Sequence, residues 1–404
     1  MLRSFRGAAM RNQLTAGLKA AAFVYDMSAG ERDTWVKRFA GPVTVTHEAI
    51  ASHGRPVDCA IYRTDPSTSR ERPLLVVTHG FAHEGHTDPR LQALCRRLAR
   101  LGFIVASPQF DEMRHYRLGL NDLADMEAVI ATMRHAPGVD ASAVGVMAFS
   151  FGAAPTLIGL SRPPLRDQVA FALIFGGYFD LRRTVRYVLT GAYDGHGHSG
   201  RVDPPTRGDD RWKFLKGNLS MVPASATSDV FARAVEARIA DPSAPVDISR
   251  CTKEERAAWA LISNRDPQLF DRLYLEAGPV LDGWIRRMSP EPTADGIRAR
   301  LFLVHSFTDQ KTPFTESIAM SRGVPLAPPP SLTLLNAFAH VDLRLNWRSL
   351  RSLLREGLPG LVAVWRVVRD ILMLARTSGH APSRLDASTY PDPAPADGAA
   401  TGRG

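Results

Sequence analysis

Short apolar runs alternate with amphipathic helical patterns between residues 74 and 175, and this alternation restricts the fold more than any other feature of the sequence. Runs at residues 74–78, 103–106, 144–149 and 169–175 have the continuous apolar character of strands that are buried on both faces. The segments between them repeat apolar residues at helical spacing. Strands that alternate with helices pair in parallel through right-handed crossovers, so we predict an α/β protein whose sheet is covered on both faces.

Two further patterns extend this prediction. Residues 43–48 and 57–63 alternate β-branched residues with others and predict an antiparallel pair at a sheet edge. The strand and helix rhythm stops after Gly177 and resumes at residues 301–305, with helical patterns and a polar, glycine-rich piece at residues 191–217 in between. We therefore predict a helical insertion at this place, with amphipathic helical patterns around residues 181–189, 230–239 and 269–288.

These boundaries divide the chain into four predicted parts. The parts are an N-terminal helical segment (1–40), an α/β core (41–177 and 299–376), a helical cap insertion (178–298) and a disordered tail (377–404). A last strand at residues 331–335 and a long helical stretch at residues 343–375 complete the core. The tail is too rich in Pro, Gly, Ala, Ser and Asp to pack.

Composition excludes several classes of protein. The sequence contains no run of about 18 or more apolar residues and no unbroken apolar secretory signal near Met1. Its three cysteines, Cys59, Cys95 and Cys251, form no C-x-x-C pair, so we expect neither a disulfide framework nor a thiolate zinc site. We therefore expect a soluble protein of the reducing cytoplasm.

The net charge of +9 comes mainly from arginines that are scattered among acidic residues. Pairs such as Arg96 with Arg97, and Arg286 with Arg287, are typical of solvated helix faces. They form no continuous basic stripe, so we expect no nucleic-acid partner.

Ser150 lies between a predicted buried strand and a predicted helix, in the stretch Ala148-Phe149-Ser150-Phe151-Gly152. A sharp turn at this place lifts a side chain above the carboxyl ends of parallel strands. Such a turn requires small residues two positions before and two positions after the serine, and Ala148 and Gly152 meet this requirement. The pattern resembles the nucleophile elbow of the α/β-hydrolase superfamily, with alanine where the strict pattern has glycine.

The resemblance implies a doubly wound, mostly parallel sheet and an enzyme similar to serine esterases and lipases, whose nucleophile, acid and histidine follow in that order. Ser150 is the implied nucleophile, and Asp309 and His340 each follow a later predicted strand. In this reading Asp309 orients His340, which acts as the base. Asp180 occupies the other position where the family keeps its acid, and it is the alternative to Asp309.

The loop after the first parallel strand, Thr78-His79-Gly80-Phe81-Ala82, resembles the H-G-x loop of the same superfamily. The resemblance implies that the backbone N–H groups of Phe81, Ala82 and Phe151 stabilise an oxyanion. His79 and Gly80 then support the loop, and His79 takes no part in proton transfer.

These roles predict hydrolysis of a carboxylic ester in a small-molecule acyl substrate through an acyl-enzyme on Ser150, without a cofactor. Thioesters and amides would use the same machinery. Two alternatives stay open: a hydrolase-like binding or scaffold protein with a closed cap, and a lipid hydrolase at the inner face of a membrane. Apolar helical patterns with arginines at residues 10–25 and 358–375 fit helices packed on the sheet, and they also fit peripheral membrane contact.

Two groups of histidines lie close together along the sequence. One group comprises His79, His83 and His86 with Glu84 and Asp88, and the other comprises His196 and His198. Neither group has a known ligand spacing on a rigid element, so we expect no metal site.

Overall fold

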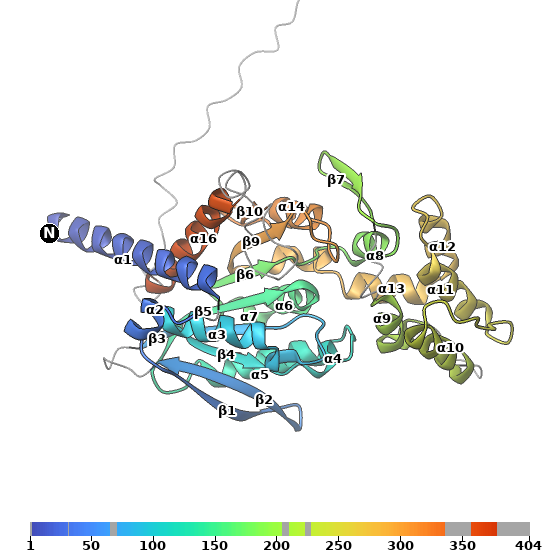
Figure 1. Cartoon of the computed structure of the whole chain (residues 1–404), viewed down its shortest axis with the longest axis horizontal. Helices are drawn as coiled ribbons and strands as arrows, with labels where there is room; N and C mark the ends of the chain where they lie inside the picture. Colours follow the sequence, from blue (N-terminus) through green and yellow to red (C-terminus); the bar gives the residue numbers. More distant parts are fainter. Residues whose placement is uncertain are drawn as a thin grey trace, which may run out of the picture.

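A computed structural model describes residues 2–30, 32–64, 71–203, 210–222, 228–335 and 357–377. Within these residues, eight strands form one sheet in the order β1-β2-β4-β3-β5-β6-β9-β10 (Figure 1). The strands are β1 (Val43–Ser52), β2 (Arg55–Thr64), β3 (Arg72–Thr78), β4 (Ile104–Pro108), β5 (Val139–Phe149), β6 (Phe171–Phe175), β9 (Arg300–Ser306) and β10 (Ser331–Leu335). β2 is antiparallel to both β1 and β4, and the other neighbours are parallel. The predicted α/β class and mostly parallel sheet are confirmed.

The two antiparallel strands at the edge are joined by a two-residue turn. His53 and Gly54 both have positive φ, 45° and 80°, as the tight hairpin turns that suit the twist of the strands require. In the hairpin β1 pairs residue by residue with β2, and Ala49 lies opposite Asp58. The predicted antiparallel pair is therefore confirmed.

Helices cover both faces of the sheet. α3 (Pro89–Leu101) packs on one face with α1 (Leu2–Ala29) and α16 (Leu358–Thr377), which lie side by side (Figure 1). On the other face lie α5 (Asn121–Met133) and α6 (Ala153–Leu160). Successive residues of a strand point to opposite faces, so Leu74 and Val76 join one core and Leu75 and Val77 join the other.

Capping residues determine where α3 begins and ends. The Asp88 side chain accepts a hydrogen bond from the Arg90 backbone N–H at 2.8 Å, and Pro89 occupies the first helical position. Gly102 ends the helix with a left-handed φ of 109°. The helix start predicted from Asp88 and Pro89 is confirmed.

The N-terminal helix is held to the rest of the molecule by polar contacts with α3 and α16. Asp26 is buried and accepts hydrogen bonds from Thr34 Oγ1 at 2.7 Å and from Arg97 Nε at 3.2 Å. The Trp365 indole N–H donates to the Gly17 carbonyl at 2.8 Å. These contacts fix one side of α1, and none of the described helices is long and apolar enough to cross a membrane.

The chain between β6 and β9 forms helices beyond one end of the sheet (Figure 1). They are α8 (Leu181–Thr190), α9 (Arg211–Gly217), α10 (Ser228–Ala240), α11 (Lys253–Ser263), α12 (Phe270–Glu276) and α13 (Pro279–Arg287). The helical pattern predicted around residues 269–288 forms two helices, because Gly278 with a φ of 88° and Pro279 separate α12 from α13. The glycine-rich piece also contains a hairpin that was not predicted, β7 (Ala192–Gly195) and β8 (His198–Arg201).

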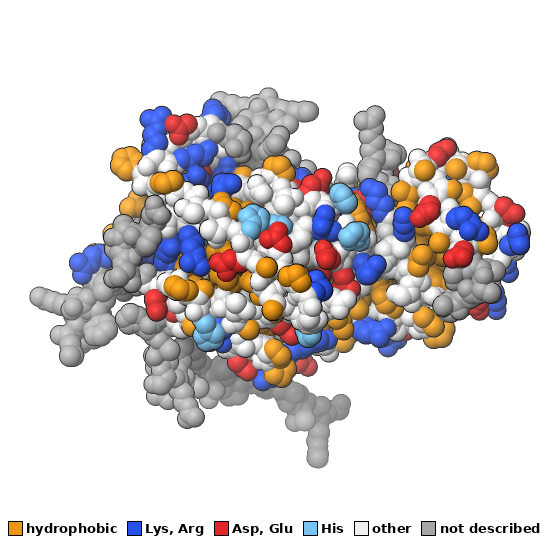
Figure 2. Space-filling model, turned by 90° about the horizontal axis from the view of Figure 1, so that it is seen from below, with side chains coloured by type: hydrophobic (Ala, Val, Ile, Leu, Met, Phe, Trp, Pro, Cys, Tyr) orange, Lys and Arg blue, Asp and Glu red, His pale blue; other side chains and the backbone are white. Residues whose placement is uncertain are grey.

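Short helices complete the described chain: α2 (Trp35–Phe39), α4 (Asp111–Arg114), α7 (Pro163–Arg166) and α14 (Thr315–Gly323). Residues 343–356 of the predicted last helical stretch lie outside the described residues, as do residues 378–404 of the predicted tail. On the face shown in Figure 2, basic and acidic side chains are interspersed.

Candidate active site

Ser150 occupies a strained turn at the carboxyl end of β5. The turn spans Ser150–Gly152 and leads directly from Phe149, the last residue of β5, into α6. Ser150 has a φ of 51°, in the left-handed region that residues with a Cβ rarely adopt. Its side chain is largely buried. Backbone strain of this kind persists only where the surrounding structure imposes it.

The loop after β3 packs against this turn so closely that only glycine fits at two positions. A Cβ on Gly152 would lie 2.3 Å from the His79 carbonyl oxygen. On the other side of the contact, a Cβ on Gly80 would lie 2.9 Å from the Phe149 oxygen and 3.1 Å from the Ser150 Cβ. The two backbone segments are therefore in direct contact, which explains why glycine stands two positions after the serine.

The His79 imidazole holds this loop in place. The Phe110 backbone N–H donates to His79 Nε2 at 3.1 Å, so the ring proton lies on Nδ1, which donates to the Gly80 carbonyl at 2.8 Å. Burial lowers the pKa of His79 to about 4. With both ring nitrogens engaged, the neutral ring joins the loop to Phe110, two residues after the end of β4.

Asp309 lies after the end of β9 and is buried, although its neighbours Thr308 and Gln310 are exposed. Its Oδ1 accepts hydrogen bonds from the backbone N–H groups of Lys311 at 2.7 Å and Thr312 at 3.0 Å. Its Oδ2 lies 3.1 Å from the position that a Cβ would take on Gly176, just beyond β6. Since β6 is the neighbour of β5, the carboxylate lies at the same edge of the sheet as Ser150.

Asp180 lies at a different place and makes different contacts. It caps the N-terminus of α8, where its Oδ1 accepts a hydrogen bond from the Arg183 backbone N–H at 2.8 Å. The buried Glu316 carboxylate accepts from the backbone N–H groups of Phe179 and Asp180 and pairs with Arg183 at 2.7 Å. The alternative acid thus belongs to a network that anchors α8.

His340 lies outside the described residues. A second histidine, which the sequence analysis missed, supports the acid loop: His305 is fully buried, and its ring nitrogens contact Ser317 Oγ at 2.7 Å and the Thr312 carbonyl at 3.0 Å. His305 Nε2 also lies 3.6 Å from Asp309 Oδ2. A histidine that ends an otherwise apolar strand is the sequence signal that could have indicated this residue.

The sheet and its flanking helices are similar to those of solved structures. A puromycin hydrolase superposes with a TM-score of 0.50 at 14% identity, over 87% of this chain and 42% of that chain. This structural similarity, together with the strand order and the turn at Ser150, identifies the fold. The chain has the α/β-hydrolase fold.

Other structures with this fold are similar at equally low identity. An acylaminoacyl peptidase of Pyrococcus horikoshii has a TM-score of 0.47 and 12% identity, over 85% of this chain and 43% of that chain. Brefeldin A esterase, a bacterial homologue of human hormone sensitive lipase, has a TM-score of 0.47 and 15% identity, over 92% and 86%. The chain spans 40–43% of the length of the first solved structures that it matches. No family model and no curated protein matches the sequence.

A cavity of about 180 Å³ lies beside Ser150 in this α/β-hydrolase fold. Phe81 and Phe151 line it and stack with ring centroids 4.5 Å apart, and the ring centroid of Phe214 of α9 lies 6.0 Å from that of Phe81. Its other lining residues are Tyr116, Val185, Val188, Leu189, Asp210, Arg211, Ile262, Arg265, Gln310 and Lys311. The insertion therefore contributes to the lining, which combines aromatic rings with charged side chains.

The strain at Ser150 predicts that glycine is more stabilising than alanine there, which is the opposite of the order expected at an ordinary helical position. Ser150→Gly is expected to have a free energy of unfolding about 1 kcal/mol higher than Ser150→Ala, because glycine adopts the left-handed φ without a steric cost. Ser161, with a φ of −82°, is the matched control. There, Gly should be less stable than Ala by about 0.5 kcal/mol. Chemical denaturation measures all four variants, and the same order at both sites would contradict the assigned strain.

The buried His79 predicts a specific sensitivity to acid. Its folded pKa of about 4 lies below its ordinary value of 6.5, so the unfolded chain binds a proton that the folded chain does not. Stability contributed by the neutral ring is therefore lost as the pH falls below 6.5, by up to about 3 kcal/mol at pH 4.

Comparison of variants isolates this effect. The stability difference between the wild type and His79→Gln is expected to shrink between about pH 8 and about pH 4. His135→Gln, at an exposed histidine, should show no such trend. A difference that stays constant for His79→Gln across this range would mean that His79 titrates normally in the folded protein.

Proposed function

We propose that the protein is a serine hydrolase that cleaves a carboxylic ester through an acyl-enzyme on Ser150. The observation that carries this proposal is the left-handed Ser150 at the carboxyl end of β5, beside a cavity that stacked aromatic rings line. Strained residues of this kind cluster at functional sites. Because the fold by itself does not determine an activity, the proposal depends on the site.

Proton transfer in this proposal uses His340 as the base and Asp309 as its orienting acid. Two backbone N–H groups fix Asp309 Oδ1, so the carboxylate plane is set by the chain and does not depend on the substrate. Oδ2 lies toward the end of β6, next to the strand that leads to Ser150. His340 would take the Ser150 proton during attack and later activate the water that releases the acyl group.

The oxyanion would be stabilised by the backbone N–H groups of Phe81, Ala82 and Phe151. The close contact between the loop and the turn supports this assignment, since the Phe151 nitrogen lies 3.6 Å from the Cβ position of Gly80. His79 would serve this site by holding the Gly80 carbonyl, which fixes the loop before any substrate binds.

The cavity supports a small-molecule acyl substrate. The stacked rings of Phe81 and Phe151 lie beside Ser150 and offer an apolar surface to an acyl chain or an aromatic group. Among the other lining residues, Lys311 Nζ lies 2.9 Å from Asp210 Oδ2, so a charged pair also borders the cavity. Thioesters and amides would react by the same steps.

Substitution of the two candidate acids tests the assigned machinery. Asp309→Asn is expected to lower kcat for hydrolysis of p-nitrophenyl esters by about 10³–10⁴-fold, because an amide cannot stabilise the charged base. Asp180→Asn should retain activity within about twofold, because asparagine is an equally good helix cap. The rate of p-nitrophenol release gives kcat for both variants, and Ser150→Ala gives the background rate. The reverse order would assign the acid to Asp180.

Peripheral attachment to a membrane is a second candidate, which a surface stripe on α1 favours. Met10, Leu14 and Leu18 are 60%, 61% and 72% exposed and recur every fourth residue on one side of the helix. An apolar stripe on a helix with exposed basic residues can lie in the interface of an anionic bilayer. This candidate adds a location to the proposed hydrolase and directs it toward lipid esters.

Vesicle sedimentation tests the stripe. The double variant Leu14→Glu, Leu18→Glu is expected to lose binding to anionic phospholipid vesicles, because two carboxylates oppose both insertion and surface charge. Leu275→Glu is the control, since Leu275 is 74% exposed on α12 in the insertion. Equal sedimentation of both variants, or none of the wild type, would rule out attachment through α1.

A further inference from the structure

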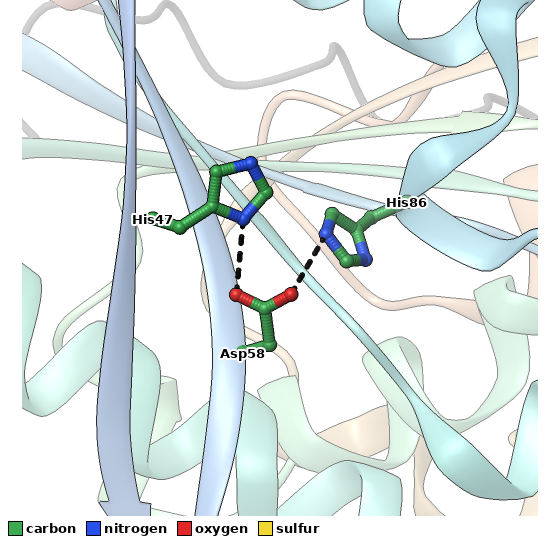
Figure 3. Close-up of side chains that lie close together, drawn as sticks. All are labelled: His47, Asp58 and His86. Atoms are coloured by element: carbon green, nitrogen blue, oxygen red, sulfur yellow. Dashed lines mark hydrogen bonds and ion pairs between the residues drawn. The ribbon is translucent and has the colours of Figure 1, made fainter.

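Three side chains with metal-ligating atoms meet at the edge of the sheet, outside the candidate active site. His47 lies on β1, Asp58 on β2, and His86 on the loop after β3 (Figure 3). We propose that His47, Asp58 and His86 bind a Zn²⁺ ion. This proposal does not depend on the proposed hydrolase activity.

The register of the edge hairpin brings two of the ligands together. Asp58 lies opposite Ala49, and His47 lies two residues before Ala49 on the same face of β1. Such diagonal neighbours on antiparallel strands are within reach of each other when a side chain is long. His47 Nδ1 therefore lies 3.1 Å from Asp58 Oδ1.

The distances among the ligand atoms suit one small ion. Asp58 Oδ2 lies 3.3 Å from His86 Nε2, and the ligating atoms of all three residues lie within 4.8 Å of one another. Ligands of a tetrahedral zinc ion with bonds of about 2.0–2.1 Å are about 3.3 Å apart. Two of the ligand separations already have this length, so modest rotation of the His47 ring would complete the set.

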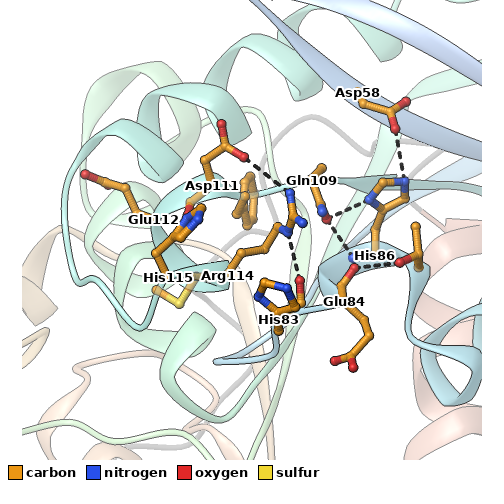
Figure 4. A network of polar contacts seen from close by, with 12 residues as sticks. Asp58, His83, Glu84, His86, Gln109, Asp111, Glu112, Arg114 and His115 are labelled. Atoms are coloured by element: carbon orange, nitrogen blue, oxygen red, sulfur yellow. Dashed lines mark hydrogen bonds and ion pairs between the residues drawn. The ribbon is translucent and has the colours of Figure 1, made fainter. Parts of the chain in front are cut away.

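His86 presents a buried lone pair to this space. Gln109 Oε1 accepts hydrogen bonds from the His86 backbone N–H at 2.8 Å and from His86 Nδ1 at 2.7 Å (Figure 4). Because an amide oxygen only accepts, Nδ1 carries a ring proton, and Nε2 is the atom left facing Asp58. His86 is 1% exposed, and its Nε2 has no hydrogen-bond partner. A metal ion between Nε2 and the carboxylate would give this buried nitrogen a partner.

Gln109 orients two of the three ligands. Its side chain fixes the His86 ring, and its backbone N–H donates to the Asp58 carbonyl at 2.8 Å. Gly85 permits this approach, because it has a φ of 58° and a Cβ there would lie 2.1 Å from Gln109 Oε1. A hydrogen-bond acceptor on the second ring nitrogen is the usual support of a metal-binding histidine.

The three donor atoms favour zinc over Mg²⁺ and Ca²⁺. Two imidazoles and one carboxylate suit zinc, whereas Mg²⁺ and Ca²⁺ prefer oxygen ligands alone. The side chains of His47 and Asp58 are 53% and 52% exposed, so an ion can enter and water can complete the coordination. Cys59, the residue after Asp58, is buried with a raised pKa, because burial disfavours its thiolate, and it does not compete.

Binding at this site would join the edge hairpin to the loop that packs on the turn at Ser150. Phe110, which follows Gln109, donates its backbone N–H to His79 in that loop. An ion held by His47, Asp58 and His86 would thus fasten one end of the loop to the edge hairpin, while Phe110 holds the other end. We expect zinc to raise the midpoint of thermal unfolding.

Metal titration of the full chain tests the proposal. The tag-free protein, stripped with a chelator and dialysed, is titrated with Zn²⁺ by calorimetry, and bound metal is counted by elemental analysis. We expect one zinc per chain, binding weaker by at least about 100-fold in His47→Asn and Asp58→Asn, and weaker by about 10–100-fold in Gln109→Ala. His53→Asn, at an exposed position in the same hairpin, is the matched control and should bind as the wild type does.

Thermal unfolding supplies a readout that is independent of activity. Zinc should raise the unfolding midpoint of the wild type and of His53→Asn, but not that of His47→Asn, and Mg²⁺ should have no effect on any of them. The proposal is overturned if the wild type binds no zinc, or if His47→Asn and Asp58→Asn bind it as tightly as the wild type.

Discussion

The structure depends on one close backbone contact, between the turn at Ser150 and the loop after β3. β3 and β5 are parallel neighbours, so their carboxyl ends deliver the two segments to the same place. The His79 carbonyl comes so near Gly152 that no side chain fits there, and a Cβ on Gly80 would lie 2.9 Å from the Phe149 oxygen. This contact holds Ser150 in a left-handed conformation that an isolated chain would avoid.

Polar contacts extend from this loop to the edge of the sheet. His79 accepts a hydrogen bond from Phe110, and Gln109, the residue before Phe110, contacts His86. His86 in turn faces Asp58 on β2. On the other side of Ser150, two backbone N–H groups and the buried His305 fix the loop of Asp309. The candidate active site therefore lies between two loops that are each held by a neutral or partnered histidine and by backbone donors.

The sequence predicts the features that depend on local periodicity and small residues. Apolar runs predict the buried strands, and the spacing of Ala148, Ser150 and Gly152 predicts the turn, because its steric requirement lies within five residues. The hairpin of β7 and β8 escapes prediction, since its strands are short, polar and largely exposed and carry no alternating pattern. α11 could have been found from its capping box at Thr252 and Glu255.

Sites assembled from distant segments cannot be predicted from the sequence for a different reason. His47, Asp58 and His86 lie on two strands and a loop, so they share no motif, and only the hairpin register and the crossover from β3 bring them together. The sequence grouped His86 with His79 and His83, its neighbours along the chain, whereas the structure places it against the edge hairpin. Proximity along a loop is thus a poor guide to ligand sets, because the direction of each side chain depends on the whole sheet.

The central claim is that Ser150 is an activated and accessible nucleophile. Covalent labelling of the purified protein with a fluorophosphonate probe, followed by mass mapping of the modified peptide, tests it directly. The account predicts near-stoichiometric label on Ser150 and none in Ser150→Ala. Absence of label, under conditions in which a known serine hydrolase reacts fully, would contradict the hydrolase and favour a binding protein whose insertion closes the site.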